Sequence, residues 1–216
     1  MNFLVIFKLK KPYLLIKLLF DLVFSFTLII LGSPLFLLIA LLIKISSKGP
    51  ILYRHKRIGK NNKYFYCIKF RTMYQNSDKL LKNLLDNNEN LKDEFKKNQK
   101  IKNDPRIIPI GQFLRKTSLD ELPQFINVIK MEMSVVGPRP IVDQEVIKYG
   151  SSISKVLSIK PGITGLWQVS GRNNLSYKKR VFLDNAYIDN INFFSDLKIL
   201  FKTIWVLLFP LDRGAY

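Results

Sequence analysis

Two residue types that build covalent or metal-bound frameworks are almost missing from this chain. Its 216 residues include one cysteine, Cys67, and one histidine, His55. One cysteine cannot form an intramolecular disulfide, and one cysteine with one histidine cannot make a Cys/His zinc cluster. His55 lies in the basic run Arg54-His55-Lys56-Arg57 without a matching triad, so we interpret it as a surface residue and expect no catalytic thiol.

Acidic residues are also scarce. The chain has 16 Asp and Glu against 35 Lys and Arg, which gives a net charge of +19. Such an excess indicates an anionic partner, which can be nucleic acid, anionic lipid or a phosphorylated small molecule. The length fits one compact domain with an attachment, and the sequence shows neither an internal repeat nor a Gly/Ser linker.

Charge is absent altogether from Leu22 to Ile43. At about 1.5 Å per residue this run would extend roughly 33 Å as a helix, which is enough to cross a bilayer core. Lys and Arg flank both ends, which favours placing both ends in the cytoplasm, and Ser33 and Pro34 at the midpoint favour a kink. We predict that residues 1–48 form a re-entrant membrane helix hairpin with its break at Ser33-Pro34. A kinked full span and a cleaved signal peptide are the alternatives.

Residues 49–216 have the character of a small, mostly helical cytoplasmic domain with short strands, so the predicted fold class is α+β. Residues 50–53 and 64–70 are typical of two strands around a turn. Residues 77–100 predict a solvated helical excursion that breaks at Asn87-Asn88.

The last apolar segment, about 193–209, predicts a helix. Lys198 and Lys202 are four residues apart and share one face, while Phe201 and Trp205 lie on another. An interfacial helix and a buried core helix both fit this pattern, and Trp205 favours the membrane interface.

An adjacent acidic pair, Asp120-Glu121, stands out in so basic a chain. Ser118 and Glu121 have the spacing of a capping box, but a helix that begins at Asp120 places Pro123 where no backbone N–H is needed, and we slightly prefer it. Either start would put Asp120 at the positive end of a helix dipole that runs to about Met133 and that also attracts phosphate. Ordinary capping is the alternative explanation for the pair.

Two arginines are candidates for binding phosphate. Arg115 precedes Asp120 by five residues, and Arg139 is held between Pro138 and Pro140 in a rigid loop. The planar guanidinium suits bidentate phosphate binding, although a plain surface charge is the alternative for each arginine.

A series of short motifs runs along nearly the whole chain. The motifs are Lys17-x-x-x-Asp21, Ser33-Pro34, Gly49-Pro50, Lys69-Phe70-Arg71-Thr72-Met73, Asp104-Pro105-Arg106, Leu114-Arg115, Ser118 to Gln124, Gly137-Pro138-Arg139-Pro140, Lys160 to Gly165 and Gly171-Arg172-Asn173. Their order closely resembles that of the bacterial sugar transferases, the monotopic polyprenyl-phosphate phosphoglycosyl transferases, in their minimal catalytic form. His55 stands where the family commonly has Gln, and Asn62 where it commonly has Gly.

The resemblance implies an enzyme of the cytoplasmic (inner) membrane that moves a sugar 1-phosphate from a UDP-sugar to polyprenyl (undecaprenyl) phosphate and releases UMP. It would act as the first membrane step of surface glycan assembly, such as capsule or exopolysaccharide. Asp120 would be the nucleophile that forms a covalent phospho-sugar, and it would also bind Mg²⁺. Glu121 would assist as a proton acceptor or metal-side orienter, and Lys69, Arg71 and Arg172 would bind phosphate.

Two other functions fit parts of the sequence. A nucleic-acid-binding protein would explain the charge, but Tyr64, Phe65 and Tyr66 match no RNA-binding signature. A non-catalytic membrane scaffold would explain the apolar segments but leaves the acidic pair without a role. We therefore expect a UDP-sugar, a polyprenyl phosphate and the membrane as partners, and no nucleic acid. The terminal Gly214-Ala215-Tyr216 is reminiscent of relatives that transfer glucose or galactose phosphate.

Overall fold

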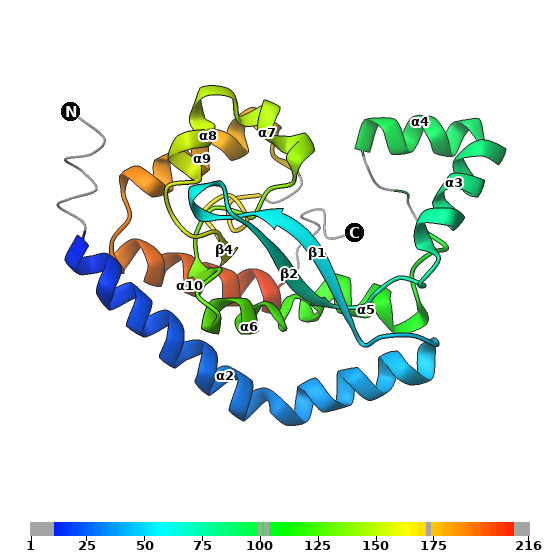
Figure 1. Ribbon diagram of the computed structural model, residues 1–216, viewed down its shortest axis with the longest axis horizontal. Coiled ribbons are helices and arrows are strands. Elements are labelled where there is room, and N and C mark those ends of the chain that lie inside the picture. Colours follow the sequence, from blue (N-terminus) through cyan, green and yellow to red (C-terminus); the bar gives the residue numbers. More distant parts are fainter. Residues whose placement is uncertain (1–10, 99–100, 102–103, 172–173, 210–216) are drawn as a thin grey trace.

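A computed structural model of the chain describes residues 11–98, 101, 104–171 and 174–209, and it has the mixed helix and strand content expected of an α+β protein (Figure 1). The elements are α2 (Lys11–Ser46), β1 (Leu52–Ile58), η1 (Lys60–Asn62), β2 (Tyr64–Phe70), α3 (Ser77–Asn87), α4 (Glu89–Asn98), α5 (Pro109–Thr117), η2 (Leu119–Glu121), α6 (Gln124–Ile129), β3 (Ser134–Val136), α7 (Asp143–Tyr149), η3 (Gly150–Ser152), α8 (Ile153–Val156), β4 (Gly162–Thr164), α9 (Tyr177–Asp189) and α10 (Phe193–Leu208).

The long N-terminal helix α2 is continuous over 36 residues and contains Pro34. Figure 1 shows that it bends near its middle. A proline removes one hydrogen bond and clashes with the preceding turn, so it kinks a helix without having to end it. The structure therefore has one bent helix here, where the sequence predicted two helices separated by a break at Ser33-Pro34. Residues Tyr13–Ser46 are long and apolar enough to cross a membrane.

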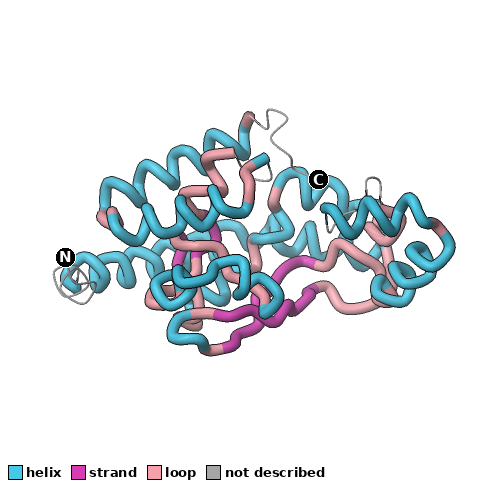
Figure 2. The backbone as a smooth tube through the Cα atoms, turned by 90° about the horizontal axis from the view of Figure 1, so that it is seen from above, coloured by secondary structure: helices cyan, strands magenta, loops and turns pink. Residues whose placement is uncertain are grey.

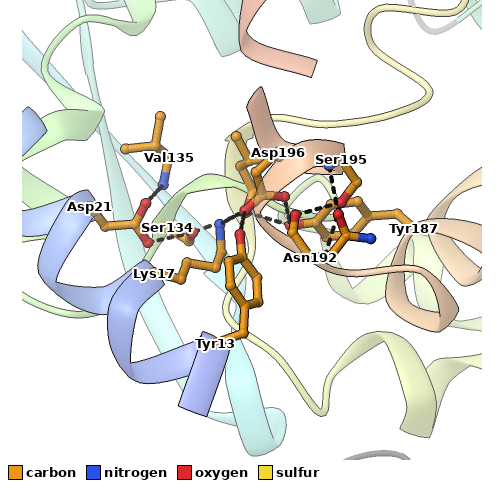
Figure 3. Close-up of polar contacts among 10 residues, drawn as sticks. Tyr13, Lys17, Asp21, Ser134, Val135, Tyr187, Asn192, Ser195 and Asp196 are labelled. Carbon is orange, nitrogen blue, oxygen red and sulfur yellow. Dashed lines mark hydrogen bonds and ion pairs between the residues drawn. The ribbon is translucent and has the colours of Figure 1, made fainter. Parts of the chain in front are cut away.

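Polar side chains attach the first half of α2 to the end of the chain (Figure 3). The Nζ of Lys17 lies 2.6 Å from Oδ2 of Asp196 on α10, and both side chains are buried. Asp196 also accepts hydrogen bonds from the hydroxyls of Tyr13, at 2.6 Å, and Tyr187, at 2.7 Å. A buried charge pair needs further hydrogen bonds to offset its lost hydration, and the two tyrosines supply them.

A second polar attachment joins α2 to β3. The carboxylate of Asp21 accepts from the Ser134 hydroxyl at 2.6 Å and from the Val135 backbone N–H at 3.2 Å. These contacts explain why charged residues stand near the start of an otherwise apolar helix.

Two short sheets lie in the central part of the molecule, and α3 and α4 project at one end (Figure 2). Strands β1 and β2 pair antiparallel from Leu52↔Phe70 to Ile58↔Tyr64, which confirms the predicted strand pair but extends its first strand to Ile58. Strands β3 and β4 pair in parallel, and their backbones approach so closely that a Cβ on Gly162 would overlap the Gly137 nitrogen. The expected break between α3 and α4 falls at Asn88, as predicted.

The segment that carries the acidic pair differs from the prediction. Ser118 has a left-handed conformation (φ 58°) and ends α5, and its side chain makes no capping hydrogen bond. Residues 119–121 then form the short turn η2, and α6 begins only after Pro123. Neither Ser118 nor Asp120 therefore starts a long helix. The left-handed Ser118 is followed only by the short turn η2, and Pro123 occupies the position just before α6.

Candidate active site

The acidic pair meets a lysine from the β1–β2 hairpin. The Nζ of Lys69, on β2, lies 2.6 Å from Oε1 of Glu121 and 3.9 Å from Oδ2 of Asp120 on η2. The structure thus brings together three of the residues that the sequence proposed for the site. One ammonium group within 4 Å of both carboxylates offsets part of their mutual repulsion.

Asp120 has an unusual environment for a carboxylate. Its exposed fraction is only 9%. Burial, opposed by the positive charge of Lys69, is the main influence on the pKa of Asp120; Glu121 raises the pKa, Arg115 lowers it, and the net result is a pKa of about 6. The group is therefore ionised at neutral pH but more basic than an exposed carboxylate, a combination that suits a nucleophile.

The two arginines that the sequence proposed for phosphate binding line the same cavity as Glu121. Arg115, on α5, donates from Nε to the Thr72 hydroxyl at 2.9 Å. Arg139 lies in the loop after β3, with its guanidinium carbon 5.8 Å from the ring centroid of Trp167. The guanidinium of Arg180 lies 4.9 Å from the same ring. Such cation–π contacts hold a guanidinium in place while its N–H groups stay available to an anion.

A large apolar cavity opens beside these charged groups. Its volume is about 610 Å³, and Arg115, Glu121 and Arg139 contribute its charged lining. The rest of the wall comes mainly from apolar residues of α2, α6 and α10 and of the segment around β4. These include Phe20, Phe24, Leu28, Phe125, Ile163, Trp167, Leu200, Phe201, Ile204 and Leu207. The site can accommodate a ligand with an anionic head and a long hydrocarbon body.

A second, very small cavity lies on the hairpin side of the same wall. Its volume is about 10 Å³, and its lining includes Arg57, Lys69, Glu121 and Arg139. Glu121 and Arg139 line both cavities. The charged residues therefore form a partition between the apolar cavity and the β1–β2 hairpin.

Arg71 contacts a different part of the molecule. Its two terminal nitrogens donate to the carbonyls of Lys48, at 2.6 Å, and Ser47, at 2.9 Å. These carbonyls follow the C-terminal end of α2, so Arg71 attaches that end to β2. A phosphate-binding role for Arg71 stays a prediction, and Arg172 lies outside the described residues.

His55 is not the surface residue that the sequence suggested. It is partly buried on β1, and Arg57 Nη2 lies 3.3 Å from its Nδ1. Burial, followed by the positive charges of Arg57, Lys69 and Arg139, lowers the pKa of His55 to about 4. The first strand was predicted to end at Tyr53, but it continues to Ile58, and the alternation along it places His55 on the same face as Lys69.

The C-terminal helix α10 is buried on one side and apolar on the other. Asp196, Ile199 and Val206 face the interior, whereas Phe201 and Trp205 are exposed. The predicted helix is thus confirmed, and its exposed aromatic residues have the composition of a membrane-interface helix.

Comparison with known proteins identifies similar chains. The family model described as bacterial sugar transferase matches residues 12–210. The exopolysaccharide production protein ExoY of Rhizobium meliloti is 47% identical over 91% of this chain and 86% of its own length. The undecaprenyl-phosphate galactose phosphotransferase of Salmonella typhimurium is 48% identical over 96% of this chain and 43% of its own. The UDP-galactose-lipid carrier transferase of Erwinia amylovora is 45% identical over 91% of this chain and 41% of its own length. The chain therefore spans less than half of the length of these last two proteins.

Proposed function

The chain belongs to the bacterial sugar transferase family, and from this premise we propose that it transfers a sugar 1-phosphate from a UDP-sugar to undecaprenyl phosphate. The names of the Salmonella and Erwinia relatives refer to undecaprenyl phosphate and to a UDP-sugar, and that of the Rhizobium relative to exopolysaccharide production. The observation that carries the proposal is the position of Asp120, Glu121 and Lys69 next to an apolar cavity lined by α2 and α10.

In the first step, a carboxylate oxygen of Asp120 attacks the sugar-side phosphorus of the UDP-sugar. The bond from that phosphorus to the bridging oxygen breaks, and UMP leaves with the electron pair. Lys69 and Arg115 balance the negative charge that accumulates when one anion attacks another. Glu121 contributes by holding Lys69 in place through their 2.6 Å contact.

In the second step, an oxygen of the lipid phosphate attacks the same phosphorus. The bond to Asp120 breaks, the carboxylate is restored, and the sugar is left on a lipid diphosphate. The large cavity suits this acceptor because its walls are mostly apolar and its lining includes the charged groups of Arg115, Arg139 and Glu121. The phosphate of the lipid can thus contact arginine while its hydrocarbon chain stays among apolar side chains.

Asp120 is also the residue that we propose to hold Mg²⁺. The described residues contain no group of three or more His, Cys, Asp or Glu that could hold a metal by themselves. Mg²⁺ is commonly bound by one or two carboxylates together with substrate phosphates, and Asp120 with the diphosphate fits that mode. When bound, Mg²⁺ would supply charge neutralisation at the diphosphate.

For the membrane segment we propose that α2 enters the cytoplasmic leaflet of the inner membrane and returns, with residues 49–216 as the catalytic domain. Lys17 and Asp21 attach the first half of α2 to α10 and β3, and Arg71 attaches its last turn to β2. Both ends of α2 therefore contact the same domain, which lies on one side of the membrane. The bend near Ser33 and Pro34 is compatible with such a path.

The test of the proposed function uses the full chain in detergent with a panel of UDP-sugars and no lipid. We expect one UDP-sugar to give a stoichiometric release of UMP and a protein mass increased by one phospho-sugar, mapped to Asp120 by peptide analysis. Adding undecaprenyl phosphate should then remove the added mass and start turnover.

Asp120→Asn should show neither the release of UMP nor the added mass. The matched control is Asp86→Asn on the exposed helix α3, which should behave as the wild type. Sequential kinetics without a protein adduct would contradict the covalent route and indicate direct transfer between two bound substrates. A wild-type protein that releases no UMP from any UDP-sugar, with or without lipid, would overturn the proposed function.

A further inference from the structure

The β1–β2 hairpin brings a histidine to the face that contacts the acidic pair. Directly opposed residues of an antiparallel pair project from the same face, and the face alternates along each strand. The register pairs His55 with Cys67 and Tyr53 with Lys69. His55 therefore shares a face with Lys69 and is its diagonal neighbour, at a typical Cβ separation of about 7 Å.

The contact with Arg57 determines which nitrogen of His55 carries the proton. A guanidinium has only donors, so Arg57 Nη2, 3.3 Å from His55 Nδ1, requires Nδ1 to be the acceptor. A neutral ring with an acceptor at Nδ1 has its proton at Nε2. Burial and the surrounding positive charges keep the ring neutral, because they lower the pKa of His55 to about 4. His55 thus presents a neutral Nε2–H donor.

The surroundings of this donor have an excess of positive charge. The positive charges of Arg57, Lys69 and Arg139 all act on His55. The same three cations line the small cavity next to the hairpin, together with a single carboxylate, Glu121. Glu145 lies 3.7 Å from Arg57 Nη1 and offsets part of the remaining charge. Cations gathered in this way favour an anionic ligand, and phosphate oxygens are the acceptors that a neutral N–H and several cations would bind together.

We propose that His55 donates a hydrogen bond from Nε2 to the nucleotide-side phosphate of the UDP-sugar, which is the phosphate that departs as UMP. This inference rests on the proposed function. The Nζ of Lys69 lies 3.9 Å from Asp120, where the attacked phosphorus must lie, and His55 is the diagonal neighbour of Lys69 on the same hairpin face. In the proposed arrangement the nucleotide-side phosphate of the same diphosphate lies towards His55. A neutral donor stabilises the charge that develops on the leaving phosphate without attracting the carboxylate of Asp120 or Glu121.

The test compares three variants with the wild type. His55→Phe keeps a ring but has no donor, His55→Gln restores a donor through its amide, and Arg54→Ala changes the neighbouring exposed residue on the opposite face of β1. We expect His55→Phe to raise the inhibition constant for UMP, and to lower kcat/KM for the UDP-sugar, by about tenfold or more, the usual effect of losing a hydrogen bond to a charged group. His55→Gln should recover most of this loss, and Arg54→Ala should match the wild type.

Two further measurements separate binding from folding. kcat/KM for undecaprenyl phosphate should be unchanged in His55→Phe, because the nucleotide has left before the lipid reacts, whereas a general structural defect would lower both constants. Two results would overturn the proposal for His55: the same inhibition constant for UMP in His55→Phe and the wild type, or the same loss of kcat/KM for the UDP-sugar in His55→Phe and His55→Gln. The proposed function would still stand in either case if the wild-type protein is active. If His55→Phe does not fold, His55→Asn and His55→Leu, which differ in the presence of a donor, carry the same comparison.

Discussion

At the scale of single residues, burial controls the chemistry of Asp120. Its carboxylate is almost inaccessible to solvent, and Lys69 and Arg115 only partly offset the cost of charging it, so the pKa lies at about 6. Protonation would remove the proposed nucleophile. We predict that the single-turnover rate of UMP release without lipid falls about tenfold for each pH unit below 6, as measured between pH 5 and 8. A rate that stays constant down to pH 5 would contradict this role for Asp120.

The same shift affects stability. Because the pKa of Asp120 is higher in the folded protein than its ordinary value of 3.8, the folded state binds the proton more tightly than the unfolded chain. Charged Asp120 therefore lowers the free energy of unfolding above pH 6, and this penalty disappears as the pH falls towards 4. Asp120→Asn should have a Tm at pH 7.5 equal to or above that of the wild type, with a smaller difference at pH 4.5. Thermal unfolding at the two pH values measures it, and a lower Tm for Asp120→Asn at pH 7.5 would refute the sign.

Arg71 and His55 show what the sequence could not give at this scale. The motif around Lys69 led to the expectation that Arg71 binds phosphate, yet its guanidinium contacts two carbonyls beyond α2. His55 was placed on the surface, but alternation along β1 puts it on the same face as Arg57, and it is partly buried. The carbonyl partners of Arg71 come from a tertiary contact, which composition and spacing do not encode, whereas the position of His55 follows from strand alternation once β1 is known to reach Ile58.

At the scale of elements, Pro34 determines the shape of α2. Replacing Pro34 with Leu restores the missing N–H and removes the ring, so the helix should straighten and favour a full span. We predict that cysteines placed at Lys11 and Lys48, in a Cys67→Ser background, are labelled from one side of the membrane in the wild type and from opposite sides in Pro34→Leu, with loss of transferase activity. The exposed Leu31→Met in the same helix is the control. Labelling of the wild type from opposite sides would exclude the re-entrant path.

Elements with a local sequence signal were predicted well. Alternation around a Gly-containing turn gave the β1–β2 hairpin, and paired asparagines gave the break between α3 and α4. The parallel pairing of β3 with β4 has no local signal, since it joins two three-residue segments that are separated by a helical excursion. The start of α6 was missed because nothing in the sequence reveals the left-handed conformation of Ser118.

At the scale of the whole molecule, the Lys17–Asp196 pair joins the first described helix to the last. Removing one partner of a buried ion pair leaves an uncompensated charge and typically costs about 3–5 kcal/mol. We predict that Lys17→Met lowers the Tm of the detergent-solubilised protein strongly, and that Lys17→Met combined with Asp196→Leu lowers it by less than the sum of the two single changes. Lys198→Met, an exposed lysine of α10, is the control. Additive effects would show that the two side chains do not stabilise each other.

The same pair has a consequence for the order of synthesis. Lys17 and Asp196 are 179 residues apart, so the ribosome completes α2 long before the partner of Lys17 exists. At about 5–20 residues per second, the helix waits roughly 10 to 35 s for α10. Until α5 and α6, which pack against it, have been synthesised, its apolar surface has no protein to contact, and the lipid bilayer is the environment that can shield it. The membrane therefore acts first as the holding site for α2, and the catalytic domain closes onto a helix that is already in place.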